Sequence, residues 1–173
     1  MNILNIVTYC AFAASIISLA FLLVNGWRYM QGQPANRLVA TRAGFPTKSV
    51  SFFLLSALTT VAAASIITTY ARRDVLSFLQ NLSGNYTVYV NHREVRESEK
   101  IISSLKEIAP YWAHHSHPTK RIRVYIRSDG RDLTLELGRD SGKPQEYWVF
   151  YSGHSVTSEN EIGRITTSAF DEY

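Results

Sequence analysis

Two long stretches of the sequence contain no charged side chain, and this feature constrains the fold more than any other. They cover residues 3–24 and 49–71. Each is long enough to supply the roughly 20 helical residues that cross about 30 Å of hydrocarbon. We therefore predict two membrane-spanning helices, at about residues 3–25 and 49–71, joined by a basic loop at 26–48. Two buried helices of a soluble domain are the alternative, but that reading does not explain the absence of charge.

A cleaved signal peptide is a second reading of the first stretch. Such a peptide needs a basic segment before a shorter apolar core. Here only the terminal amine precedes the core, and the core is long, so we expect the stretch to be retained. Cys10 is the only cysteine, which excludes an intramolecular disulfide and a multi-cysteine zinc site. Because the apolar run continues beyond Cys10, we do not expect a lipoprotein attachment there.

Small side chains gather on one face of each predicted spanning helix. Such faces let two helices approach closely, so that packing contacts hold them together in lipid. We expect the two helices to pack as a hairpin, and the alternative is a face for self-association or for another membrane protein. The residues concerned are Ala11, Ala14, Ser15 and Ser18 in the first helix, and Ser56, Thr59, Thr60 and Ala63 in the second.

The charge distribution predicts an orientation. All 14 acidic residues lie at or after Asp74, so the six basic residues before it give the front of the chain a charge of +6. The remaining 12 basic and 14 acidic residues give −2, and the pI near 9.3 is therefore no sign of nucleic-acid binding. Four of the six front charges lie in the connecting loop, and Arg72 and Arg73 follow the second helix. This excess places the loop in the cytoplasm and both termini outside, which is the periplasm in a Gram-negative cell.

After the membrane segment (residues 1–72), we predict an amphipathic stalk at 73–83 and a soluble α+β domain at 84–173. Val75, Phe78, Leu79 and Leu82 have the spacing of one helix face. The run Tyr86–Val90 is rich in aromatic and β-branched residues and predicts a strand, followed by a turn at Asn91-His92. A helix capped by Ser98 then runs toward Pro110, with its apolar face formed by Ile101, Ile102, Leu105 and Ile108.

Residues 121–127 and 132–137 both alternate apolar and polar side chains, and Asp129-Gly130 between them is a strong hairpin signal. A two-residue loop sets the register. Apolar residues then face each other in the pairs Ile126–Leu133, Val124–Leu135 and Ile122–Leu137. On the other face Arg127 meets Asp132, Tyr125 meets Thr134 and Arg123 meets Glu136, so each charge meets its opposite.

Residues 146–151 predict another strand, which is apolar on both faces and is therefore internal to the sheet or covered by a helix. Ser158 and Glu161 fit a capping box, and Ile162, Ile165 and Ala169 then predict a last helix. The predicted fold is a membrane-anchored α+β protein with two transmembrane helices. Its small domain has a mostly antiparallel sheet of about four strands with helices on one face.

Three histidines, His114, His115 and His117, lie within four residues and predict a zinc, copper or nickel site, with His92 or His154 as a fourth ligand. The competing readings are a polar loop and a pH-sensing loop. A hydrolase reading would use Ser141 as nucleophile and His154 as base, but no nucleophile-elbow motif supports it. The basic cluster of Lys120, Arg121, Arg123 and Arg127 is partly matched by acids and reads as a solvated face.

Aromatic residues are dense in this small domain. Some of them are expected to form an interaction surface, because tyrosine and tryptophan are common interface anchors; core packing is the alternative. The candidates are Tyr111, Trp112, Tyr125, Tyr147 and Trp148. The sequence therefore predicts a non-enzymatic, membrane-anchored domain that binds a protein or an envelope component outside the cytoplasm. No cofactor is expected apart from the metal of the histidine reading, and no nucleic acid.

Overall fold

The computed structural model describes residues 3–31, 47–82, 84–111, 115–128, 130–153 and 160–173. The chain divides into two compact units, Met1–Ile66 and Ile67–Tyr173. Helix α2 contributes to both units, which are described separately below.

The first unit contains α1 (Ile3–Gln31) and the beginning of α2 (Thr47–Gln80). Both helices are long and apolar enough to cross a membrane by length and composition, over Tyr9–Trp27 and Thr47–Gln80. Large apolar side chains of this unit point outward; Phe21, Leu23, Leu55 and Leu58 are 62–67% exposed. A core helix of a soluble protein would bury such side chains.

The two helices of the first unit contact each other through small polar residues. The hydroxyl oxygens of Ser15 and Thr60 lie 3.3 Å apart, and so do those of Ser18 and Ser56. Ser18 is buried and also donates to the carbonyl of Ser15, one turn back. The prediction that the small-residue faces pack on each other is therefore confirmed for these four residues.

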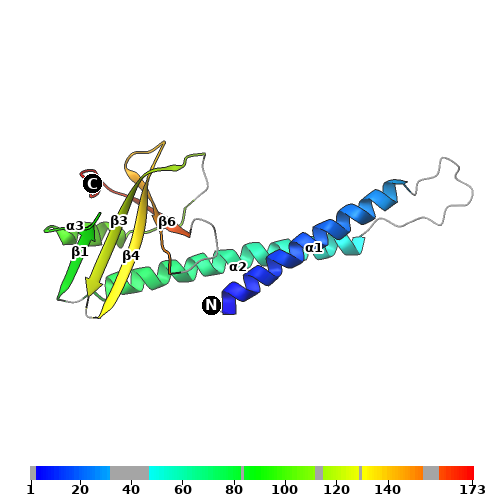
Figure 1. Cartoon of the computed structure of the whole chain (residues 1–173), viewed down its shortest axis with the longest axis horizontal. Coiled ribbons are helices and arrows are strands. Elements are labelled where there is room, and N and C mark those ends of the chain that lie inside the picture. Colours follow the sequence, from blue (N-terminus) through cyan, green and yellow to red (C-terminus); the bar gives the residue numbers. More distant parts are fainter. Residues whose placement is uncertain (1–2, 32–46, 83, 112–114, 129, 154–159) are drawn as a thin grey trace, which may run out of the picture. The chain divides into compact units, whose positions relative to one another are not determined.

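The second unit is built on a six-stranded, fully antiparallel sheet with the order β2-β1-β3-β4-β5-β6. Strands β1, β3 and β4 of this sheet lie side by side in Figure 1. An α-helix, α3 (Ser98–Leu105), lies between β2 and β3 in the chain. The strands are β1 (Tyr86–Val90), β2 (Arg93–Glu94), β3 (Pro118–Ser128), β4 (Arg131–Asp140), β5 (Glu146–Phe150) and β6 (Glu161–Thr166).

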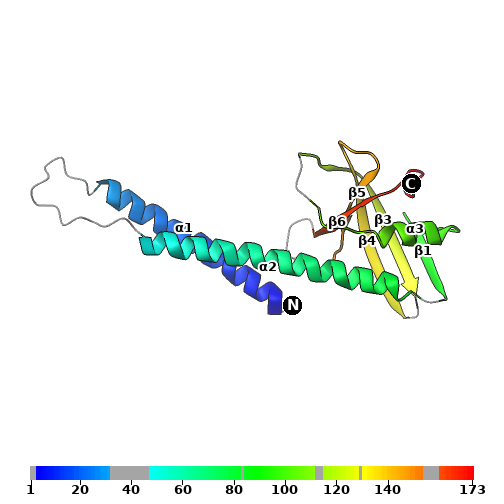
Figure 2. The ribbon, with the colours of Figure 1, turned by 180° about the vertical axis from the view of Figure 1, so that it is seen from behind.

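One face of the sheet, which we call the core face, is covered by α3 and by the last turns of α2 (Figure 2). Val75 and Leu79 of α2 are completely buried there, as is Leu105 of α3. The residues predicted as an amphipathic stalk therefore contribute apolar side chains to the core of the sheet unit. α3 begins at Ser98, but its N-cap position is Glu97, which makes no capping side-chain hydrogen bond.

The predicted register of the β3–β4 hairpin is confirmed at all six pairs. Gly130 in its loop has a positive φ of 78°, which glycine adopts without strain. The Asn91-His92 turn is confirmed as the two-residue loop between β1 and β2, with positive φ at both residues. Positive φ at both positions is the requirement of a type I′ turn, whose twist matches that of the flanking strands.

The expectation of about four strands is wrong, because the sheet has six. Strand β2 follows the turn after β1 and has two residues, which is too short to produce a recognisable pattern in the sequence. The predicted last helix is also wrong: Ile162 and Ile165 belong to β6, which pairs along β5, and Ser158 lies outside the described residues. Strand β4 runs to Asp140, three residues beyond the alternating stretch that predicted it.

Candidate functional site

The face of the sheet opposite the core, which we call the outer face, carries the candidate site. Side chains from β1, β3 and β4 line it, because residues on these strands alternate between the two faces. Arg121, Arg123 and Thr134 are exposed, whereas Tyr89 and Tyr125 are half-buried. The rings of Tyr89 and Tyr125, which are directly paired across the strands, lie 5.9 Å apart.

Three shallow hollows adjoin one another on the outer face. The largest, of about 710 Å³, lies between Arg121, Arg123 and Phe150. The second, of about 500 Å³, is lined by both tyrosines and by Arg123, and the third, of about 300 Å³, by His92 and Arg123. Arg123 therefore borders all three hollows.

The arginines on either side of Arg123 already have partners. Arg121 makes an ion pair with Glu136 at 3.0 Å, and its guanidinium lies 4.3 Å from the centre of the Phe150 ring. Arg127 donates to the Tyr125 hydroxyl at 2.9 Å and lies 3.6 Å from Asp132. Arg123 lies directly opposite Glu136, as the register predicts, but Glu136 forms its ion pair with Arg121 instead.

The side chain of Arg123 makes no ion pair and no hydrogen bond with any residue that the structure describes. Its backbone is held by Asn91, whose side-chain oxygen accepts the Arg123 N–H and whose backbone N–H donates to the Arg123 carbonyl. Among the described residues, the outer face thus offers one uncompensated guanidinium, between two that are paired within the face. This arrangement was not apparent from the sequence, where all three arginines alternate in the same way.

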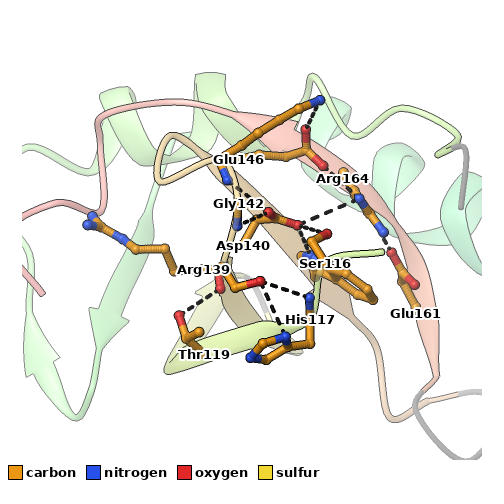
Figure 3. A network of polar contacts seen from close by, with 12 residues as sticks. Ser116, His117, Thr119, Arg139, Asp140, Gly142, Glu146, Glu161 and Arg164 are labelled. Atoms are coloured by element: carbon orange, nitrogen blue, oxygen red, sulfur yellow. Dashed lines mark hydrogen bonds and ion pairs between the residues drawn. The ribbon is translucent and has the colours of Figure 1, made fainter. Parts of the chain in front are cut away.

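The far end of the outer face, over β5 and β6, is closed by a buried ionic network (Figure 3). Arg164 of β6 is its cation and makes ion pairs with Glu146 at 2.8 Å, Glu161 at 3.1 Å and Asp140 at 3.8 Å. Its guanidinium lies 3.9 Å from the centre of the Trp148 ring and 5.1 Å from that of Tyr111. Burial alone would lower the pKa of Arg164, but its hydrogen bonds to Glu146 and Glu161 outweigh this and raise it.

Asp140 holds the other side of the network. One carboxylate oxygen accepts hydrogen bonds from the Ser116 hydroxyl at 2.5 Å and from the Trp148 indole N–H at 2.7 Å. The other accepts from the backbone N–H groups of Gly142 and Lys143 at 2.8 and 2.9 Å. Burial would raise the pKa of this carboxyl, yet the four hydrogen bonds hold it far below its usual range.

A carboxylate whose pKa is held far below its usual range is poorly suited to proton transfer near neutral pH. Asp140 instead fixes the β4–β5 turn and the segment at Ser116 to the sheet.

Ser141, the candidate nucleophile, lies 3.3 Å from Nδ1 of His117, and its hydroxyl oxygen accepts the His117 backbone N–H. No described carboxylate contacts His117, so the described residues assemble no Ser-His-acid triad; His154, the predicted base, lies outside them.

The predicted metal ligands are only partly placed. His115 and His117 are exposed, His114 and His154 lie outside the described residues, and His92 borders the hollows of the outer face. Within the described part of the chain, no group of three or more histidine, cysteine or acidic side chains is arranged to hold a metal ion. The metal site therefore stays a prediction.

The five predicted surface aromatics do not share one surface. Tyr147 is completely buried on the core face, against Phe170, and Trp148 is buried beneath Arg164. Tyr111 is 39% exposed beside the ionic network, and Tyr125 borders the second hollow. Trp112 lies outside the described residues.

Comparison with protein-family models, with curated proteins and with solved structures finds no match for this chain.

Proposed function

We propose that this chain is a membrane-anchored, non-enzymatic binding protein that uses the outer face of its sheet to hold another protein. The observation that carries the proposal is the contrast between the two faces of the sheet. Helices α2 and α3 bury the core face, whereas β1, β3 and β4 present arginines, tyrosines and three hollows on the other. Arginine and tyrosine are the side chains that most often dominate protein interfaces.

The anchor in this proposal is the helical hairpin of the first unit. Its outward-facing Phe, Leu and Ile side chains suit lipid, and its inward serines and threonines form hydrogen bonds with one another. With the basic loop in the cytoplasm, the sheet unit would lie in the periplasm or outside the cell. The network around Asp140 and the lack of a triad among the described residues favour binding over catalysis.

Reporter fusions at the C-terminus test the orientation. We expect an active alkaline phosphatase fusion and an inactive cytoplasmic reporter. The opposite pattern would refute the extracytoplasmic assignment and leave the binding proposal to be tested in the cytoplasm.

Site-specific photo-crosslinking in cells tests the binding face. A benzophenone amino acid at exposed Thr134 of the outer face is expected to trap a discrete adduct of defined mass. The same amino acid at Ser103, on the exposed side of α3, is the matched control and should trap none. Adducts at Ser103 but not at Thr134, or at neither position, would contradict the proposal.

A further inference from the structure

We infer that Arg123 is the main binding residue of the outer face and that it binds a carboxylate in an acidic segment of the protein partner. This inference rests on the proposed function and specifies its chemistry. It starts from the one arginine of the face that the described residues leave uncompensated, at the point where three hollows meet.

The β1–β2 turn holds the backbone of Arg123 in place. Its backbone N–H is held by Asn91 of the β1–β2 turn, and its backbone carbonyl accepts the Asn91 N–H. These bonds fix the main chain beneath the side chain. Arginine presents a planar fork of donors that matches both oxygens of a carboxylate. A fixed main chain and a guanidinium that no described residue pairs together make a hydrogen-bond donor site for a single anionic group.

The surroundings of Arg123 favour a protein segment over a uniform polyanion. Glu136 and Asp132 are within the same face, and they would repel the continuous phosphates of a nucleic acid or an anionic membrane surface. The sheet domain also carries 12 basic against 14 acidic residues from position 74 onward. A peptide can place one carboxylate at Arg123 and neutral groups beside the acids.

The second hollow supplies the apolar part of the recognition. Tyr89 and Tyr125 are half-buried and packed against each other, so their rings are already ordered before a partner arrives. Ordered aromatic rings offer contact area at a small cost in conformational entropy. The inferred partner segment therefore combines an acidic residue, for Arg123, with an adjacent aromatic or apolar residue, for the tyrosine pair.

Fluorescence anisotropy on the full chain in detergent micelles tests the inference. The probes are two short labelled peptides, one alternating Glu with Tyr and one alternating Gln with Tyr. The wild type should bind the Glu peptide at least about tenfold more tightly, because hydrogen bonds to charged groups are worth more than neutral ones. Arg123→Gln should abolish this preference and Arg123→Lys should retain part of it. Arg96→Gln, which removes an exposed arginine away from the hollows, should leave it unchanged.

Equal affinity for the two peptides, or an unchanged preference in Arg123→Gln, would overturn the inference, provided that circular dichroism shows the variant folded. Tighter binding to an oligothymidylate or to phosphatidylglycerol vesicles than to the Glu peptide would also overturn it, in favour of that polyanion. Crosslinking at Thr134 separates the two levels of the argument. An adduct that persists in Arg123→Gln refutes the role of Arg123 alone, whereas no adduct in the wild type refutes the proposed function.

Discussion

Replacing Asp140 with asparagine tests how the buried ionic network holds the sheet unit together. The change keeps the shape of the side chain but turns one acceptor oxygen into an NH₂ donor. If the amide oxygen stays with the N–H groups of Gly142 and Lys143, the new NH₂ faces Ser116 and Trp148. The serine hydroxyl can rotate and accept, but the indole N–H of Trp148 is only a donor. Flipping the amide would set NH₂ against two backbone donors, which is worse.

The magnitude follows from what the indole loses. A hydrogen bond to a charged acceptor contributes about 1.5–3 kcal/mol, and a buried donor left without an acceptor costs about 1–3 kcal/mol. Arg164 also loses one of its three carboxylates, although Glu146 and Glu161 remain. We expect Asp140→Asn to lower the free energy of unfolding by about 3 kcal/mol at neutral pH.

The pH dependence has a definite sign. Because folding lowers the pKa of Asp140, its stabilising contribution is fully present above the unfolded-state value of about 3.9. The contribution is lost progressively as the pH falls below that value toward the folded pKa. The difference between wild type and Asp140→Asn should therefore be constant from pH 7 to about pH 5 and should shrink below about pH 4.

Urea unfolding of the Ile67–Tyr173 unit, followed by circular dichroism, measures both quantities. Asp132→Asn is the matched control, because Asp132 is half exposed and its ion pair with the exposed Arg127 is screened by solvent, so this change should cost much less than Asp140→Asn. Combining Asp140→Asn with Trp148→Phe should cost less than the sum of the two changes, since the unpaired indole N–H is then absent. A loss below about 0.5 kcal/mol for Asp140→Asn, or one that does not change between pH 7 and pH 3, would refute this reasoning.

Three further changes probe how the sheet unit is assembled. Leu79→Ala should destabilise it by about 2–5 kcal/mol in the same urea assay, because Leu79 of α2 is completely buried; a loss below about 1 kcal/mol would exclude α2 from the core. Gly138→Ala places a Cβ 2.5 Å from the Cβ of Pro118 and should cost about 1–3 kcal/mol; a wild-type melting temperature would contradict this. Gly163→Ala places a Cβ against the carbonyl oxygen of Ala109 and should speed amide exchange at Ala109, where unchanged exchange would show that the bridge tolerates the methyl group.

The local features of this fold were readable from the sequence. The β3–β4 hairpin is set by alternation and a two-residue turn, so every side chain that decides its register lies within about twenty residues. The apolar face of α3 is equally local, and the four residues predicted for it are buried. The small-residue faces of α1 and α2 are separated in sequence, but the chemistry of close packing marks each of them independently.

The sequence predicts a helix where the structure has β6, because the spacing of the apolar residues there fits a helix as well as a strand. Ile162, Ile165 and Ala169 recur at helical intervals, but they are buried here by different means, the isoleucines within β6 and the alanine beyond its end. What decides for a strand is the edge of β5, whose backbone groups need a partner. One signal did exist: residues 146–151 are apolar on both faces, which is typical of a strand inside a sheet, and such a strand has a neighbour at each edge. Strand β4 is the neighbour of β5 at one edge, so the other edge needs a further strand, which is β6.

The candidate site could be predicted only in part, and Arg123 shows the physical reason. The hairpin register correctly puts Arg123 opposite Glu136, but a backbone pairing does not choose a side-chain partner. Phe150, from the non-adjacent strand β5, lies against the Arg121 guanidinium, and Glu136 bonds that arginine on the diagonal instead. The guanidinium freed by this choice is the one that borders all three hollows. Replacing Phe150 with alanine should therefore release Arg121, let Glu136 turn to Arg123, and weaken the Glu-peptide preference without any change at Arg123 itself.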